Sequence, residues 1–212
     1  MVKQISILWK KYSYILLFAF IILGMFDMRF AIAAIICMVG PIILSFWKGR
    51  YWCGNLCPRG SFYDNLIFKF SKKRKVPKFL KSTFFRVFMV LFIISMFSYG
   101  VVTNWGNLYG IGMVFYRIIV ITTIIGVILS LIYNHRTWCN FCPMGTIASF
   151  IAKLRKSDKV LKISSSCITC KLCEKKCPLE IVPFHYKGNL LSHPDCIQCG
   201  RCIEVCPRKA IK

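Results

Sequence analysis

The sequence predicts a membrane α-helical protein in two parts, with four apolar helices followed by a small cysteine-rich α+β domain. Two observations carry this prediction. Of the 212 residues, 57% are hydrophobic, a share above that of ordinary soluble domains. Eight of the 13 cysteines lie in the last 46 residues. We therefore expect a transmembrane domain at residues 1–155 and a separate cysteine-rich domain at residues 160–212.

Four apolar stretches define the first part: Tyr14–Phe26, Phe30–Trp47, Val87–Val102 and Arg117–Tyr133. Each is predicted to cross the bilayer as a helix, although several are shorter than the roughly 20 residues of a straight spanning helix. Flanking aromatic side chains would complete the crossing at the interface. A soluble core is excluded because so many apolar stretches leave too little polar sequence to cover them. A cleavable signal peptide is excluded because residues 27–29 lead directly into the second stretch without a small-residue cleavage site.

The distribution of charge orients these helices. Few of the 30 Lys and Arg residues lie in the connections 27–29 and 100–117, whereas the N-terminus and the segment after the second stretch are basic. The positive-inside rule therefore predicts a multi-pass protein of the cytoplasmic (inner) membrane, with its N-terminus and cysteine-rich domain in the cytoplasm. The net charge of +23 follows largely from this topology, and no nucleic-acid-binding motif accompanies it. The basic residues in question are Lys3, Lys10, Lys11, Lys48, Arg50, Arg59, Lys69, Lys72, Lys73, Arg74, Lys75, Lys78 and Lys81.

The first part contains a repeated cysteine–proline motif. Residues 50–61 read RYWCGNLCPRGS and residues 136–146 read RTWCNFCPMGT. When Gly54 is deleted, both fit the pattern R-x-W-C-N-[LF]-C-P-x-G-[ST]. Each motif follows a pair of apolar stretches, so we expect a duplicated helical hairpin whose halves are related by an axis along the membrane normal. That symmetry is expected to bring four cysteines together at the cytoplasmic face: Cys53, Cys57, Cys139 and Cys142.

Two runs of four cysteines occupy the second part, and each has the spacing Cys-x2-Cys-x2-Cys-x3-Cys-Pro. This is the spacing of two-cluster bacterial ferredoxins, in which the fourth cysteine of each run ligates the other run's cluster. Structural zinc sites usually use separated cysteine pairs, and a disulfide scaffold needs an oxidising compartment, against the expected topology. We therefore predict two [4Fe–4S] clusters in an α+β ferredoxin-like domain. One is expected on Cys167, Cys170, Cys173 and Cys206, and the other on Cys177, Cys196, Cys199 and Cys202.

Together these motifs resemble the NapH/NosR-type membrane iron–sulfur proteins. The shared features are four or more spans, a cysteine–proline motif after alternate spans and a C-terminal two-cluster ferredoxin, and they cover nearly the whole chain. The resemblance implies an electron-transfer subunit that relays electrons between a quinol pool or cytoplasmic donor and a membrane or extracytoplasmic redox partner. One departure is that the second motif reads CxxCP, whereas the first motif and the family form read CxxxCP.

Three interpretations of Cys53, Cys57, Cys139 and Cys142 stay open. They hold a third iron–sulfur cluster; they act as redox-active dithiols or bind a metal such as Cu(I), which soft thiolates suit; or they pack as small apolar side chains at structural helix ends. The repeated setting beside Arg and Trp favours a ligand or redox role, with a cluster first.

Two other functional classes compete with electron transfer. One is a membrane metal-ion (cupric) reductase or metalloenzyme-assembly factor, and the other is a redox sensor. No catalytic residue is assigned, because neither a dinucleotide fingerprint nor a catalytic triad occurs. None of His135, His185 and His193 lies within a predicted span, so a bis-His haem in the bilayer has no ligands. The uncharged loop 100–116 is either an aromatic interface belt or a quinone or partner site, and the short spans suit a hetero-oligomer with a second membrane subunit.

Overall fold

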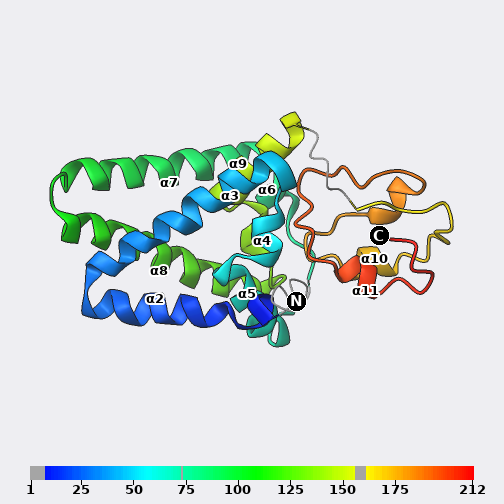
Figure 1. Cartoon of the computed structure of the whole chain (residues 1–212), viewed down its shortest axis with the longest axis horizontal. Helices are drawn as coiled ribbons and strands as arrows, with labels where there is room; N and C mark the ends of the chain where they lie inside the picture. Colours follow the sequence, from blue (N-terminus) through cyan, green and yellow to red (C-terminus); the bar gives the residue numbers. More distant parts are fainter. Residues whose placement is uncertain (1–7, 73, 156–160) are drawn as a thin grey trace.

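The computed structural model describes residues 8–72, 74–155 and 161–212. Lys3 and Lys73 of the predicted basic segments and most of the predicted domain junction lie outside these residues. Figure 1 shows long helices running side by side at one end of the molecule and residues 161–212 at the other. In chain order the helices are α2 (Tyr14–Phe26), η1 (Met28–Ala34), α3 (Ile35–Lys48), α4 (Tyr51–Asn55), α5 (Pro58–Asn65), η2 (Ile67–Lys69), α6 (Lys78–Lys81), α7 (Thr83–Thr103), α8 (Leu108–Ile132), η3 (Thr137–Asn140), α9 (Pro143–Arg155), α10 (Leu172–Lys176), η4 (Pro183–Tyr186) and α11 (Arg201–Glu204).

Three helical segments of the described residues are long and apolar enough to cross a membrane: Met28–Lys48, Thr83–Thr103 and Leu108–Ile132. The predicted first span coincides with α2, whose 13 residues are too few for a complete crossing. Residues 8–12 are also helical, and the amide of Ser13 donates to the carbonyl of Trp9 (2.8 Å), which prolongs this helix toward the N-terminus. A fourth span at α2 therefore stays a prediction.

The connection between α7 and α8 is shorter than the sequence suggests. The predicted loop 100–117 is reduced to residues 104–107, because α7 continues to Thr103 and α8 begins at Leu108. Asn107 caps α8 by accepting hydrogen bonds from the amides two and three residues later (3.1 and 3.2 Å). The polar loop residues thus serve as a helix cap, and the prediction of a long outer loop was wrong.

Small residues let the apolar helices approach one another closely, as is common in membranes. A Cβ atom added at Gly112 of α8 would lie 2.0 Å from the carbonyl oxygen of Met28. Next to this contact, Ala31 and Ala34 of η1 and Phe115 of α8 form a buried apolar cluster. Gly112, which lies in the segment predicted as a loop, thus allows α8 to contact the second span closely.

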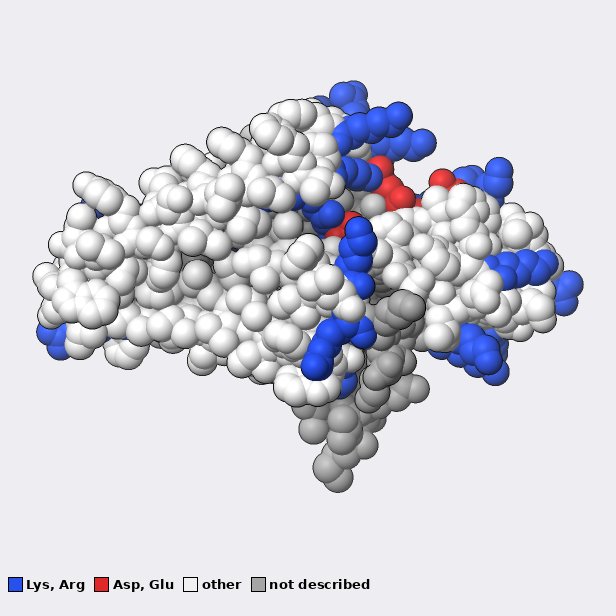
Figure 2. All heavy atoms as spheres, turned by 90° about the horizontal axis from the view of Figure 1, so that it is seen from above, with Lys and Arg blue, Asp and Glu red and all other residues white. Residues whose placement is uncertain are grey.

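The surface of the helical end suits lipid. Figure 2 shows it almost free of charged side chains, while Lys and Arg gather near and beyond its junction with residues 161–212. Large apolar side chains are exposed along it, including Phe84 (79%) and Tyr99 (74%). A water-soluble protein rarely exposes so continuous an apolar surface. The chain is therefore a membrane protein.

Residues 161–212 contain less sheet than the predicted α+β class implies. They hold two isolated antiparallel bridges, Lys162–Leu190 and Ile163–Ile211, and no longer strand. Beside the second bridge, Lys162 and Lys212 exchange two backbone hydrogen bonds (2.8 and 3.0 Å). An apolar core that includes Ile163, Leu191 and Ile211 holds the loops together. The α+β assignment is thus not confirmed.

Candidate iron–sulfur centres

Two cavities in residues 161–212 are each lined by four cysteines. The first is lined by Cys167, Cys170, Cys173 and Cys206. The second is lined by Cys177, Cys196, Cys199 and Cys202. Each cavity therefore combines three cysteines of one run with the fourth cysteine of the other, which is the grouping that the spacing predicts. Four thiols around an otherwise largely apolar cavity fit a [4Fe–4S] cluster.

The backbone of the two cysteine runs repeats. Thr169 and Gln198 hold equivalent positions and have left-handed φ angles of 53° and 52°. Lys171 and Gly200 are also equivalent, with φ angles of 61° and 83°. Left-handed φ is uncommon for residues other than glycine. Because these left-handed residues recur in both runs, the two loops share one backbone shape, as expected if each binds the same kind of group.

Backbone amides point at one sulfur atom in each cavity. The amide of Ile181 donates to Cys177 Sγ, and the amide of Ala210 donates to Cys206 Sγ, both at 3.3 Å. The residue directly before each donor again has a left-handed φ angle, 57° and 48°, which turns the amide toward the sulfur. Hydrogen bonds to cluster sulfurs are one of the protein's controls over reduction potential.

Burial leaves several of these thiols without charge. It raises the pKa of Cys196 to about 11 and that of Cys202 to about 12. A buried thiolate is unfavourable until a cation compensates it. Iron binding would therefore release protons from this cavity.

The two cysteine–proline motifs are joined by exchanged arginines. Arg50 of the first motif donates to the carbonyl of Cys139 (2.6 Å), and Arg136 of the second donates to the carbonyl of Cys53 (2.7 Å). Both side chains are 1% exposed. The exchange follows the internal repeat, because the two arginines and the two cysteines hold equivalent positions in it.

The repeated glycine of these motifs makes room for the arginines. A Cβ atom at Gly60 would lie 2.6 Å from Arg136 Nη1, and one at Gly145 would lie 2.6 Å from Arg50 Nη2. Each motif thus needs a glycine where the arginine of the other motif passes. This explains why the pattern C-P-x-G recurs.

The exchange brings the four motif cysteines near one another. Arg136 Nη1 lies 3.5 Å from Cys139 Sγ. Burial raises the pKa of Cys53, and neighbouring Cys142 and Cys139 raise it further. Burial also raises the pKa of Cys57 to about 12, with further contributions from Cys37 of α3 and then from Cys53 and Cys139. Within the described residues no three His, Cys, Asp or Glu side chains are arranged to hold a single metal ion.

Several buried donors beside these cysteines have no acceptor within the part of the chain that the structure describes. Leaving a buried donor unpaired costs about 1–3 kcal/mol. Trp52 and Trp138 directly precede a motif cysteine, and Tyr63 lies close enough to Cys139 and Cys142 to be affected by their charge. The donor atoms are Arg50 Nε, Trp52 Nε1, Tyr63 Oη and Trp138 Nε1. Tyr63 Oη lies against Gly126 of α8, so the spare donors that belong to the motifs themselves are those of Arg50, Trp52 and Trp138.

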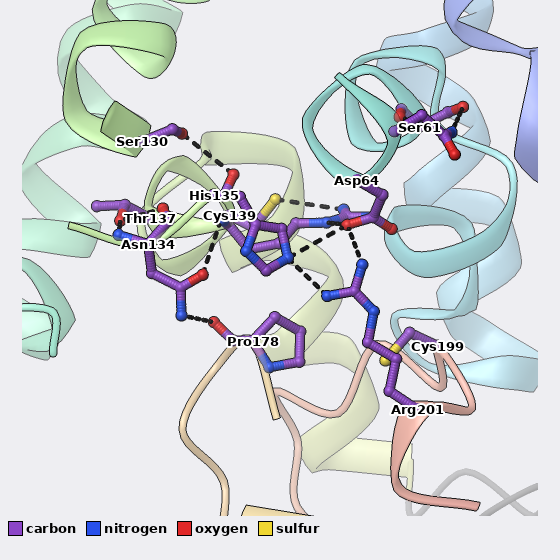
Figure 3. A network of polar contacts seen from close by, with 12 residues as sticks. Ser61, Asp64, Ser130, Asn134, His135, Thr137, Cys139, Pro178, Cys199 and Arg201 are labelled. Atoms are coloured by element: carbon purple, nitrogen blue, oxygen red, sulfur yellow. Dashed lines mark hydrogen bonds and ion pairs between the residues drawn. The ribbon is translucent and has the colours of Figure 1, made fainter. Parts of the chain in front are cut away.

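Asp64 links the two parts of the molecule, and the sequence analysis missed it. Its carboxylate accepts from Arg136 (2.7 and 2.9 Å) and from Arg201 (2.9 Å), which lies between Cys199 and Cys202 (Figure 3). Burial alone would raise the pKa of Asp64, but the two guanidinium groups hold it well below its ordinary range. Burial lowers the pKa of His135, which suits a neutral ring that accepts from Arg201 (2.6 Å).

Two further carboxylates join residues 161–212 to the helical part. Asp195, directly before Cys196, pairs with Arg50 (2.9 Å) and Arg86 (2.5 Å). Glu180 pairs with Lys81 (2.6 Å). These acids could have been found from the sequence because acidic residues are scarce in it. Only 7 Asp and Glu accompany 30 Lys and Arg, so an acid beside a cysteine motif is a candidate ion-pair partner.

The second cavity lies against the first motif, and the first cavity lies away from it. A Cβ atom at Gly54 would be 2.0 Å from the carbonyl oxygen of Ile197. Next to this contact, Gln198 Nε2 donates to the carbonyl of Lys48 (2.8 Å). Cys170, in the first cavity, is instead exposed. Gly54, the one residue that the first motif has in addition to the repeat, is thus where the loop of the second cysteine run contacts the helical part.

The chain matches two families of known proteins. Residues 30–77 and 116–161 match one described as a 4Fe-4S binding domain, and residues 166–211 match one described as a 4Fe-4S dicluster domain. The first family covers both cysteine–proline motifs, and the second covers both ferredoxin-type runs.

Similar proteins occur in archaea and bacteria. An uncharacterised protein of Methanocaldococcus jannaschii is 28% identical over 85% of this chain and 70% of its own length. The putative electron transport protein YccM of Escherichia coli is 26% identical over 82% of this chain and 54% of its own length. The ferredoxin-type protein NapH of Haemophilus influenzae is 27% identical over 77% and 61%. No solved structure matches the chain.

Proposed function

Because the chain belongs to the NapH-type family of membrane iron–sulfur proteins, we propose that it relays single electrons between a quinol pool or cytoplasmic donor and a redox partner in or across the membrane. Its role as an electron-transport protein that binds [4Fe–4S] clusters rests on the matched families and relatives. The donor, the acceptor, the ligands and the route are the proposal.

The ligands are the cysteines that line the two cavities, in a dicluster domain at residues 160–212. Each cluster, when bound, takes up and releases one electron. The chain's own residues hold the sulfur atoms, donate amide hydrogen bonds to Cys177 and Cys206, and surround both cavities with apolar side chains. Burial of this kind and hydrogen bonds to sulfur set the reduction potential.

The observation that carries the proposed route is the contact between Gly54 and Ile197. It places the loop of Cys196 and Cys199 directly on the motif that contains Cys53 and Cys57. Cys139 and Cys53 also pack in the same apolar cluster as the ferredoxin-type cysteines. Electrons would therefore pass between the first cavity, the second cavity and the motif cysteines, in that order or its reverse.

The motif cysteines are proposed to hold the next redox centre, with a third [4Fe–4S] cluster as the leading form. Two observations support this assignment. Three residues of the two motifs, Arg50, Trp52 and Trp138, have buried donor atoms without an acceptor in the described part of the chain, and both motif segments match a family described as a 4Fe-4S binding domain. If iron counting excludes a third cluster, the alternatives for these cysteines are redox dithiols, a copper site or structural helix ends.

The proposal includes the topology. Both termini and residues 161–212 would face the cytoplasm, and residues 1–155 would cross the inner membrane several times, alone or with a partner subunit. Residues 104–107, between α7 and α8, lie at the end of the molecule opposite residues 161–212 (Figure 1). They carry no charge, as the positive-inside rule expects of an outer loop.

Electron transfer into the bilayer tests the function. Dithionite-reduced protein, freed of excess reductant, is placed in nanodiscs with or without a long-chain menaquinone that stays in the lipid. We expect cluster absorbance to return faster with menaquinone, and this gain to be lost in Cys53→Ser/Cys139→Ser. Cys37→Ser, an exposed cysteine outside both motifs, is the control and should behave as wild type.

Equal rates in wild type and the double variant would contradict the route through the motif cysteines. If menaquinone does not accelerate cluster reoxidation in wild type, menaquinone is not the acceptor, and the proposed acceptor becomes a partner protein.

A further inference from the structure

The two cysteine loops are equivalent, but only one of them is covered. Ile197, which follows the first cysteine of the second run, is 2% exposed; its carbonyl lies on Gly54, and its side chain is part of a buried apolar cluster that includes Cys139. Ile168 holds the same position in the first run and is 54% exposed. Both loops carry the same left-handed turns. The surface of the second cysteine loop is therefore covered by the protein's own helical part, whereas the equivalent surface of the first cysteine loop is exposed.

The covered loop shows what kind of surface this shape binds. At its centre the backbone carbonyl of Ile197 lies against Gly54 of the first cysteine–proline motif, and the Ile197 side chain belongs to a buried apolar cluster that includes Cys139. At its edge Arg201 pairs with the carboxylate of Asp64 (2.9 Å), and Gln198 binds a backbone carbonyl. The helical part thus supplies a close-fitting apolar contact flanked by acceptors, one of them an acid.

The free loop offers the matching features. Ile168 and Leu172, which line the first cavity, are 54% and 39% exposed beside exposed Cys170. Exposed Lys171 lies between Cys170 and Leu172, and exposed Arg208 lines the same cavity. We call Ile168, Leu172, Lys171 and Arg208 the outer face.

The charge around the outer face is almost entirely positive. Among residues 161–212, Asp195 and Glu180 are occupied by ion pairs with the helical part, and Arg201 is occupied by Asp64. Eight Lys and Arg residues are left against two acids, Glu174 and Glu204. Two of the four acids of residues 161–212 are therefore paired with the helical part, and the remaining charge of this segment is mainly positive.

We propose that the outer face docks an acidic one-electron carrier protein of the flavodoxin or ferredoxin class. This inference rests on the proposed function and names its cytoplasmic partner. One electron leaves the reduced carrier and enters the centre held by the first cavity; the carrier is oxidised by one electron, and no bond or proton is exchanged. Complementary charge steers such encounters, and a small apolar contact suits a transient redox complex. The outer face belongs to the end of the molecule opposite the apolar helices (Figure 1), so a protein is favoured over lipid.

Binding is tested with oxidised flavodoxin, whose flavin fluorescence anisotropy reports its Kd for the holoprotein in nanodiscs. The test variant is Lys171→Glu/Arg208→Glu. The control is Lys153→Glu/Lys187→Glu, which reverses two other exposed charges that line neither cavity. We expect the test variant to raise Kd by about tenfold or more and to flatten its salt dependence, and the control to stay within about twofold of wild type.

Equal flavodoxin affinity in wild type and the test variant would overturn the proposal. It would also be overturned if wild type bound added phosphatidylglycerol vesicles and the same variant lost that binding, because the face would then belong to lipid. Reduction by a zwitterionic viologen separates this inference from the proposed function. If viologen-reduced protein passes electrons to menaquinone but the variant binds flavodoxin as wild type does, only the docking proposal is wrong. If viologen-reduced protein passes no electrons to menaquinone, the proposed acceptor or route is wrong.

Discussion

At the scale of single residues, the junction depends on buried arginines that each pair with a carboxylate. Arg50 and Arg136 reach across from one motif to the other, and each also binds a carboxylate. The repeat thus encodes a symmetric exchange at Arg, Cys and Gly positions. Asp64 and Asp195 lie outside the repeat and connect it to the second cysteine run.

Arg136→Gln is expected to destabilise the protein. It leaves the 8%-exposed carboxylate of Asp64 with Arg201 as its remaining guanidinium partner. Breaking a buried pair from one side costs about 3–5 kcal/mol, and we expect the lower end because Arg201 remains. The melting temperature in nanodiscs measures the effect. Asp64→Asn/Arg136→Gln removes both charges and should recover part of the loss; a double variant less stable than the single one would contradict this account.

At the scale of elements, the repeat is modified where the cysteine loop binds. Pro58 begins α5 and Pro143 begins α9, so both motifs end in the same turn into a helix. Between its cysteines the first motif has one residue more, Gly54, and forms α4 where the second forms η3. Because Gly54 has no side chain, the carbonyl of Ile197 can lie directly against the backbone of the first motif.

Gly54→Ala is expected to loosen the cysteine loop from the helical part. The added Cβ would lie 2.0 Å from the Ile197 carbonyl oxygen, which neither backbone accommodates without moving. Hydrogen exchange at residues 196–202 should rise while iron content is unchanged. Gly188→Ala adds a methyl group in open space and serves as the control, although its φ of +80° costs backbone strain. Unchanged exchange in Gly54→Ala would show that the loop is not held there.

The sequence reveals some of these elements and not others, for physical reasons. Apolar runs mark spans, and cysteine spacing marks a local wrapping loop, so α2 and the grouping of the cavity cysteines follow from pattern alone. The connection was predicted at 100–117 from its lack of charge, whereas Gly112 and its neighbours belong to α8 and contact the second span. The ion pairs of Asp64 and Asp195 join residues more than 70 positions apart, and no local pattern encodes them.

At the scale of the whole molecule, the two cysteine-lined cavities and the motif cysteines follow one another from the outer face toward the apolar helices. The first cavity is exposed at Cys170, the second adjoins the first motif at Gly54, and the exchanged arginines hold the two motifs together. The central claim is that this series continues into the membrane domain as a third iron–sulfur centre.

Iron and acid-labile sulfide per chain, with EPR of the dithionite-reduced protein, test that claim most directly. We predict about twelve iron atoms in wild type and about eight in Cys53→Ser/Cys139→Ser, at four per cluster. Cys206→Ser is the matched control and should also fall to about eight, with a different EPR signal lost. About eight iron atoms in both wild type and the double variant would contradict a third cluster and leave the motif cysteines as dithiols, a copper site or structural residues.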